Sequence, residues 1–229
     1  SENEKSEEAM YESEEIPFQE SENNEETTEV IKEKSILPEY EELYKENNDL
    51  YGWITIEDTV INYPVMQTPN SENLNFYINR NWDKEETRYG SIYVDGRCDD
   101  ETENLLIYGH NTIDGSMFGS LMDYKEKDYY EQHKYIIFDT IYEKGLYEII
   151  AVAKGIVYYE NRPDDKYLFY EHIELNSEEE FNEYMNYLKD NSWYEINNNA
   201  VYGDQIITLC TCDYWTENAR LLVVAKKIE

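Results

Sequence analysis

Two cysteines stand two residues apart in the stretch TLCTC, residues 208–212, and an arginine follows eight residues after the second of them. A thiolate is a strong nucleophile, but a cysteine needs a neighbouring base or cation that lowers its pKa before it reacts readily. The sequence holds only three cysteines, Cys98, Cys210 and Cys212, which could equally be small buried hydrophobic residues. The pattern therefore raises two hypotheses, a reactive thiol and a packed core strand.

Histidine is the usual base beside a catalytic thiol, and the sequence has three of them. His110 ends the apolar run LLIYGHN between Gly109 and Asn111, where the backbone can turn and the ring can face a groove. His133 and His172 have charged or tyrosine neighbours, which is typical of solvated or strand-face residues. His110 is therefore a candidate for the base, although its place in the sequence does not by itself decide the assignment.

Arg220 could supply a third catalytic element. Attack on a peptide carbonyl develops negative charge on its oxygen, and a fixed guanidinium can stabilise that charge. Arg220 opens the apolar run LLVVA, where a merely solubilising charge is not needed. The alternative is a surface arginine paired with a nearby carboxylate such as Glu217.

Short β-type runs must position these residues. After Gly52 the sequence becomes a succession of runs rich in Tyr, Ile and Val and bounded by turn residues, a pattern that favours a closed barrel or a sandwich over alternating βαβ units. The runs are WITI, VINYPVMQ, YGSIYVD, NLLIYGHN, KYIIFDT, LYEIIAVAKGIV, YLFYEHIEL, QIITLCTC and ARLLVVAKKI.

Helical patterns interrupt and precede these runs. We expect a helix opened by Ser35 or Pro38, with apolar residues at helical spacing behind it. A longer helix with a capping-type start at Ser177 is expected within residues 176–194, before the cysteine strand. Short helices are also expected within residues 71–82 and 115–124.

Composition sets the domain boundaries and excludes some partners. Residues 1–34 contain 13 acidic and 3 basic residues and few apolar ones, so we predict an acidic disordered stalk there and a catalytic-sized domain at 35–229. The formal charge of −33 would repel nucleic-acid phosphates, so nucleic acid is not an expected partner. We find neither 18 consecutive apolar residues nor a signal-peptide pattern.

Taken together, TLCTC, Arg220 at the start of the last run, and YGHN about 100 residues upstream resemble the sortases, cysteine transpeptidases of Gram-positive cell surfaces. The resemblance extends over residues 36–229 and implies a mainly β fold, a closed eight-stranded sortase-type barrel with N-terminal helices. It also implies that Cys212 is the nucleophile, His110 the acid and base, and Arg220 the clamp for substrate and oxyanion. The helical sequence before the barrel and the long helix at 177–190 are most like class B, since the Asp-Pro-aromatic lid motif of class C is missing.

Cys210 departs from the class B pattern, which commonly has serine at this position. Residues two apart in a strand face the same side, so we expect Cys210 to point into the groove with Cys212 and to contact substrate. Thr211 and Asn111 are also expected to contact substrate. Asn111 could equally hold the turn. A disulfide between the two cysteines is not expected, because their Cα atoms would lie at or beyond the limit of about 7 Å.

Asp213 directly follows the expected nucleophile. Its side chain should point to the face opposite Cys212 in a regular strand, so we predict a polar residue that initiates the turn rather than a partner of His110.

The resemblance implies transpeptidation on surface proteins that carry a sorting signal of the LPxTG or NPxTx kind. The signal would be cleaved after its threonine and the acyl group passed to an amine of a peptidoglycan precursor or another amine acceptor. No cofactor and no metal are expected. The enzyme would act at the extracytoplasmic face of the membrane, anchored by an N-terminal segment missing from this chain. Two alternatives stay open, a secreted cysteine hydrolase with the same dyad and a catalytically silent β-barrel surface module.

Overall fold

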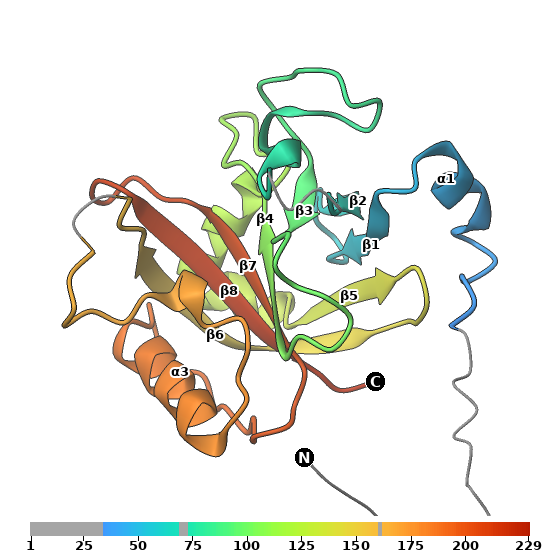
Figure 1. The fold of residues 1–229 in the computed structure, drawn as a ribbon. Helices are drawn as coiled ribbons and strands as arrows, with labels where there is room; N and C mark the ends of the chain where they lie inside the picture. The colour runs from blue at the N-terminus through green and yellow to red at the C-terminus, as the bar shows by residue number, and fades with distance from the viewer. Residues whose placement is uncertain (1–33, 69–72, 160–161) are drawn as a thin grey trace, which may run out of the picture. The chain divides into compact units, whose positions relative to one another are not determined.

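Eight strands close into a barrel in the part of the chain that the computed structural model describes, residues 34–68, 73–159 and 162–229 (Figure 1). The order around the barrel is β1-β2-β3-β4-β7-β8-β6-β5, with β2–β3 and β4–β7 parallel and the other neighbours antiparallel. The bounds are β1 Leu50–Thr55, β2 Asn62–Met66, β3 Ile92–Val94, β4 Asn104–Tyr108, β5 Tyr135–Thr140, β6 Leu146–Ile156, β7 Ile206–Cys212 and β8 Ala219–Lys227. The predicted closed eight-stranded barrel is confirmed.

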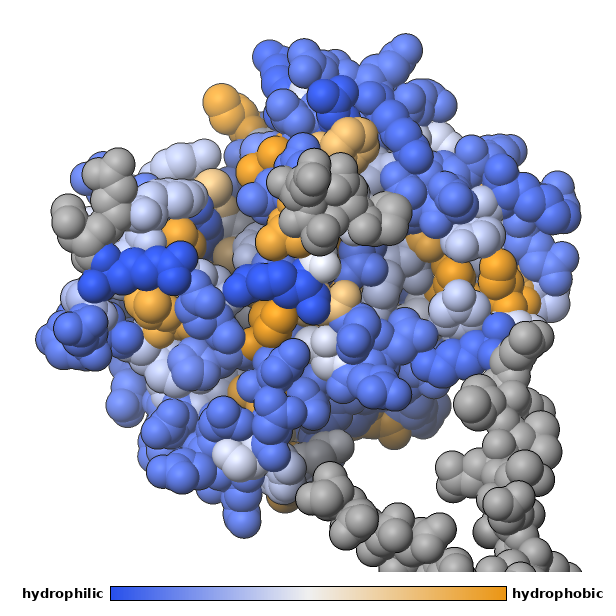
Figure 2. Space-filling model, in the orientation of Figure 1, coloured by the Kyte–Doolittle hydropathy of each residue, from blue (hydrophilic) through white to orange (hydrophobic). Residues whose placement is uncertain are grey.

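The predicted stalk at 1–34 lies outside the described residues except for Lys34, and it stays a prediction. Among the residues that are described, no helix has the length and apolarity needed to cross a membrane. The surface seen in Figure 2 is largely hydrophilic, in keeping with the strong net negative charge.

The central strands are buried on both faces, which explains their continuous apolar sequence. Six of the seven residues of β7 are buried, and only Cys212 at its end is partly exposed. Leu209 belongs to the main hydrophobic core, while Thr208 meets the Tyr184 hydroxyl of the helix α3 (Glu178–Asp190). A strand covered on both sides loses its alternation of polar and apolar residues. Cys210 and Cys212 therefore lie on a strand that the surrounding core holds on both faces.

The long helix before the cysteine strand follows the sequence prediction closely. Ser177 accepts a hydrogen bond from the Glu180 backbone N–H at 3.2 Å, the N-cap contact that the capping pattern predicts. Phe181, Tyr184 and Leu188 are buried, so one face of α3 packs on the barrel, where it contacts β6. The capping-type start at Ser177 is confirmed.

One predicted strand is wrong. The run YLFYEHIEL at 167–175 forms no strand and holds only the 3₁₀-helix η3 (Phe169–Glu171). The barrel closes without it, since β4 already pairs with β3 and β7. It meets β4 at Asn104, whose backbone and side-chain amides donate to the carbonyls of Ile173 and His172.

The first helix begins later than expected. Helix α1 is Glu41–Glu46, with Tyr40 rather than Ser35 or Pro38 at its N-cap. The Leu37 backbone N–H donates to the Ile141 carbonyl, which holds the chain out of a helix at this point. In the described residues α1 is the single helix before β1, so the plural N-terminal helices of the prediction are not seen. The remaining short helices are η1 Phe76–Asn79, η2 Gly119–Lys125 and α2 Lys127–Gln132.

Candidate active site

The parallel pairing of β4 with β7 brings the predicted base to the predicted nucleophile. Tyr108 at the end of β4 is the register partner of Cys210, and the Gly109 backbone N–H donates to the Cys210 carbonyl at 3.2 Å. Parallel strands end at the same edge of a sheet. The next residues along each chain, His110 and Cys212, therefore emerge side by side.

The antiparallel pairing of β7 with β8 adds the arginine. Arg220 is the register partner of Cys212, directly across the ladder. His110, Cys212 and Arg220 all line one cleft of about 250 Å³. The structure thus brings together three residues that are up to 110 positions apart in the sequence. Other residues of this cleft are Asn75, Ile78, Tyr93, Tyr108, Tyr159 and Tyr170.

His110 is held from the side of η1. Its Nε2 lies 2.5 Å from the Ile78 carbonyl oxygen. A carbonyl can only accept, so in this arrangement Nε2 carries the proton and Nδ1 of a neutral ring has a free lone pair. The ring is thus prepared to take a proton at Nδ1 while Nε2–H stays fixed.

Arg220 is half-buried and its guanidinium is held at two points. One terminal nitrogen donates to the Ala219 carbonyl at 2.9 Å, and the other donates to the Tyr159 hydroxyl at 2.7 Å. Burial lowers the pKa of Arg220, but the neighbouring Cys210, Cys212 and Tyr159 raise it, and the net shift is upward. The expected alternative, an exposed arginine paired with Glu217, is not what the structure shows.

The two strand cysteines differ sharply in environment. Cys210 lines the cleft but is only 1% exposed, and burial raises the pKa of its thiol to about 12. Cys212 is partly exposed in the same cleft. Burial likewise raises the pKa of Cys98 to about 12. All three are free thiols. Cys212 is therefore the thiol best placed to meet a ligand.

Thr211 and Asn111, expected to contact substrate, both make hydrogen bonds that join the two strand ends. The Thr211 hydroxyl donates to the Gly109 carbonyl at 2.7 Å, and the Asn111 amide donates to the Cys212 carbonyl at 2.9 Å. Asn111 thus holds the turn, which was one of its two predicted roles. Both contacts fix the position of the Cys212 backbone relative to the His110 segment.

Asp213 is more buried than a residue that merely initiates a turn. It does accept a hydrogen bond from the Tyr214 backbone N–H at 2.7 Å, as the turn prediction implies. Its side chain also forms an ion pair of 2.7 Å with Lys125 from η2, and it is only 3% exposed. Lys125 in turn lies 4.8 Å from the centre of the Trp193 ring. The sequence pattern gave no sign of this buried pair.

The other two histidines lie outside the cleft and pack on aromatic rings. His133 stacks on Tyr129 at 4.1 Å between ring centres, and His172 stacks on Tyr167 at 4.0 Å. Burial lowers the pKa of His172. Both are more packed than the solvated or strand-face histidines that the sequence suggested.

Two partners in the cleft escaped the sequence analysis. Tyr159 follows β6 in an ordinary tyrosine-rich run, and Ile78 contributes a backbone carbonyl, which any residue could supply. Within the described residues, no cluster of three or more His, Cys, Asp or Glu side chains is arranged to hold a metal ion.

Comparison with known proteins agrees with this geometry. A family model described as Sortase domain matches residues 54–228. The chain is 35% identical over 199 residues to Sortase B of Listeria monocytogenes serovar 1/2a (strain ATCC BAA-679 / EGD-e), with 84% of this chain and 75% of that protein covered. It is 31% identical over 199 residues to Sortase B of Staphylococcus aureus (strain NCTC 8325 / PS 47), with 86% and 77% covered.

A solved structure described as a Staphylococcus aureus sortase B-substrate complex superposes with a TM-score of 0.72 at 31% identity, covering 86% of this chain and 87% of that one. The family model, the sequence relatives and the solved structure thus all match most of the chain and all point to the same family. The chain therefore belongs to the sortase family of cysteine transpeptidases, and its relatives are of class B.

Proposed function

We propose that Cys212 is the nucleophile of this transpeptidase, His110 its general acid and base, and Arg220 the group that stabilises the oxyanion. The observation that carries the proposal is the register of β7, which places Cys212 opposite Arg220 on one side and next to the His110 segment on the other. All three side chains reach one cleft. A nucleophile, a proton carrier and a cation are what acyl transfer requires.

The first half-reaction forms a thioacyl enzyme. The Cys212 thiolate attacks the substrate carbonyl carbon, so a C–S bond forms and negative charge develops on the oxygen beside Arg220. His110, as imidazolium, then donates a proton to the departing nitrogen while the C–N bond breaks. The amine product leaves, and His110 becomes neutral.

The second half-reaction transfers the acyl group. An incoming amine attacks the thioacyl carbon and gives a proton to the neutral His110, and the C–S bond breaks to release the Cys212 thiolate. Water in place of the amine would give hydrolysis. The arrangement is thus restored to the charge state from which the cycle began, with Cys212 as thiolate and His110 as imidazolium.

We assign the substrate as a surface protein with a C-terminal sorting signal of the LPxTG or NPxTx kind, cleaved after threonine. The acceptor is an amine of a peptidoglycan precursor, and the enzyme is anchored at the extracytoplasmic face of the membrane. Support comes from the class B relatives and from the similar Staphylococcus aureus structure whose description names a bound substrate.

The test uses mass spectrometry on the purified chain with sorting-signal peptides and triglycine. Wild type should give a thioacyl adduct on Cys212 and a product that contains the added amine. Cys212→Ala should give neither, whereas Cys98→Ala, which removes a buried thiol outside the cleft, should give both. Turnover by Cys212→Ala would overturn the assignment of the nucleophile. A wild-type product that never contains the amine would instead favour the hydrolase alternative.

A further inference from the structure

Two charged residues that follow β3 form a bidentate pair. Asp95 is buried, and the Arg97 guanidinium donates to both of its carboxylate oxygens at 2.9 Å, once from Nε and once from a terminal nitrogen. The Arg97 backbone N–H also donates to this carboxylate at 3.0 Å. Burial raises the pKa of the Asp95 carboxyl, but these contacts with Arg97 lower it, and the net shift is downward. The pair therefore stays charged at neutral pH, and its two parallel bonds fix the plane of the guanidinium.

Arg97 also holds the segment that was predicted to be a strand. The terminal nitrogen that contacts Asp95 donates at 2.7 Å to the carbonyl of Tyr170, in the middle of η3. The other terminal nitrogen lies 3.5 Å from the Glu171 carboxylate. A segment that forms no strand lacks the ladder of hydrogen bonds that would fix its backbone. The contact from Arg97 therefore supplies part of what holds this segment against the barrel.

Tyr170 joins this segment to the end of β6. Its ring is buried and lines the cleft. Its hydroxyl accepts from the Tyr158 backbone N–H at 3.1 Å and donates to the Tyr158 carbonyl at 3.3 Å. The next residue, Tyr159, also lines the cleft, and its hydroxyl accepts from Arg220. We call Tyr159 and Tyr170 the tyrosine wall, which Arg97 contacts at one end and Arg220 at the other.

Asp95 contacts another residue of the cleft. The Tyr108 hydroxyl donates to the Asp95 carboxylate at 3.1 Å, and Tyr108 lines the cleft two residues before His110. Neither Asp95 nor Arg97 lines the cleft itself. The ion pair is therefore placed to act through residues that line the cleft rather than on a bound molecule.

We propose that Arg97, fixed by Asp95, is a positioning residue that holds the tyrosine wall in the conformation that receives the sorting-signal peptide, an inference that rests on the proposed function. A wall that is fixed before binding does not have to be ordered by the peptide, so its fixation increases affinity. The effect falls on binding rather than on the chemical steps, because the three predicted catalytic residues are placed by the pairing of β4, β7 and β8.

The experiment measures steady-state transpeptidation of a sorting-signal peptide with triglycine. Arg97→Lys keeps the charge but has all its donors on one nitrogen, so it cannot hold both carboxylate oxygens and the Tyr170 carbonyl. The KM for the sorting-signal peptide should rise about tenfold, which is about 1.4 kcal/mol of binding free energy. The value of kcat should stay within about threefold of wild type, because uniform binding is what is lost. The KM for triglycine should not change.

Asp95→Asn tests the same guanidinium from its other side. It removes one of the two charged acceptors while Arg97 stays in place, so the KM for the sorting-signal peptide should again rise. The double variant should raise this KM no further than the larger single change, because both changes release one contact to the wall. Asp95→Asn also carries the test by itself if Arg97→Lys does not fold. Additive effects of the two changes would overturn the proposal.

Hydrogen exchange supplies a readout that a general loss of stability would not give. Amides of residues 167–175 should exchange at least about fivefold faster in Arg97→Lys than in wild type, with the amides of β7 in the same sample unchanged. Equal acceleration in both regions would mean that Arg97 only stabilises the fold, and the proposal would be wrong.

Arg162→Lys is the matched control, since Arg162 contacts the same segment through Glu171 but is exposed and lies outside the cleft. It should keep the wild-type KM. A KM for Arg97→Lys within about twofold of this control would overturn the proposal, and so would a fall confined to kcat. Failure of the proposed function itself would appear differently, as no thioacyl enzyme in wild type.

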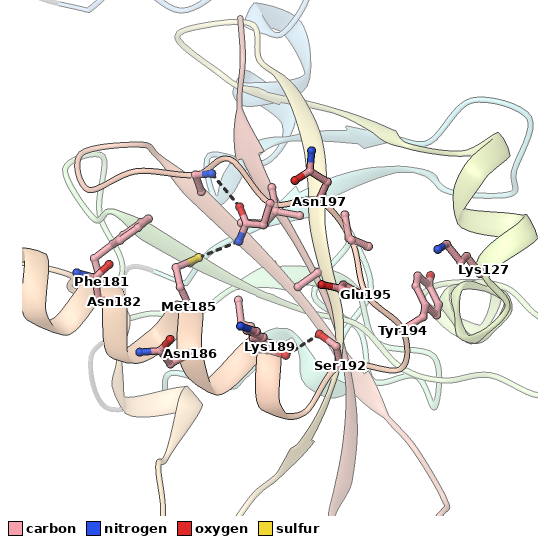
Figure 3. Close-up of a pocket in the computed structure, with 16 residues that line it drawn as sticks. Lys127, Phe181, Asn182, Met185, Asn186, Lys189, Ser192, Tyr194, Glu195 and Asn197 are labelled. Carbon is pink, nitrogen blue, oxygen red and sulfur yellow. Dashed lines mark hydrogen bonds between the residues drawn. The ribbon is translucent and has the colours of Figure 1, made fainter.

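A larger cavity supplies a second control, because it does not include the tyrosine wall. It measures about 890 Å³ and lies between α3 and residues 192–200, where Asn182, Asn186 and Lys189 project from the helix (Figure 3). Asn186→Ala should leave both KM values and the exchange of residues 167–175 at wild type. A rise in the KM for the sorting-signal peptide equal to that of Arg97→Lys would show that the effect is not specific to the wall, and would overturn the proposal.

Discussion

Replacement of Arg220 by lysine separates charge from geometry in the cleft. The guanidinium donates to the Ala219 carbonyl and the Tyr159 hydroxyl, and these contacts fix its plane next to Cys212 across the β7–β8 ladder. A lysine ammonium keeps the positive charge but has all three donors on one nitrogen at the end of a flexible stem. It cannot hold both contacts and still direct a donor to the oxyanion.

The expected loss is one hydrogen bond from a charged donor in the transition state. Such bonds contribute about 1.5–3 kcal/mol, and the half-buried site puts the loss toward the upper end. A loss of about 2.7 kcal/mol corresponds to a fall of about a hundredfold in kcat/KM. The fall should lie mainly in kcat, because negative charge on the substrate oxygen is absent from the bound ground state and develops only as the tetrahedral intermediate forms.

The assay is steady-state cleavage of a sorting-signal peptide, with the thioacyl adduct followed in parallel. Arg162→Lys is the matched control, since Arg162 is 58% exposed, lies outside the cleft and pairs with Glu171. It should retain wild-type kcat/KM. If Arg220→Lys stays within about twofold of the control, the guanidinium geometry does not contribute to the reaction and the proposed role is refuted.

Three further predictions concern the buried groups. Iodoacetamide at pH 8 should label Cys212 alone in the folded chain, because burial raises the pKa of Cys98 and Cys210 to about 12 and keeps them as thiols. A second adduct in the mass spectrum would contradict this prediction. Cys210→Ser should change kcat/KM under reducing conditions by no more than about fivefold, the net effect of one ordinary hydrogen bond; a larger loss would mean that the thiol itself is needed. Lys125→Met should lower the free energy of unfolding, measured by urea denaturation, by about 3 kcal/mol, because it leaves the Asp213 carboxylate buried without its cation. A decrease below about 1 kcal/mol would show that the pair is effectively solvated.

The barrel and the cysteine strand could be predicted because their signals are local. Strands such as β7 are covered on both sides, so they appear as continuous apolar runs that the sequence shows directly. The capping contact of Ser177 is equally local, since both of its partners lie within one helical turn. In such cases, residues close in sequence decide the structure.

Elements that depend on a distant partner were missed or misplaced. The run at 167–175 has strand-like composition, but a closed barrel leaves no free edge with which it can pair. The start of α1 is decided by a hydrogen bond from Leu37 to Ile141, about 100 residues away. Periodicity in a single segment carries no information about such partners.

The buried pair of Asp213 and Lys125 follows the same logic and bears on the chemistry. A carboxylate next to the nucleophile suggests a third catalytic group, but its Oδ1 atom is held at 2.7 Å by a lysine 88 positions away. That contact, with the Tyr214 backbone N–H, directs the carboxylate toward η2. His110 is instead held by the Ile78 carbonyl. The ring is therefore oriented by a neutral backbone acceptor, whereas the Asp213 carboxylate is bonded to Lys125 and to the backbone of the β7–β8 turn.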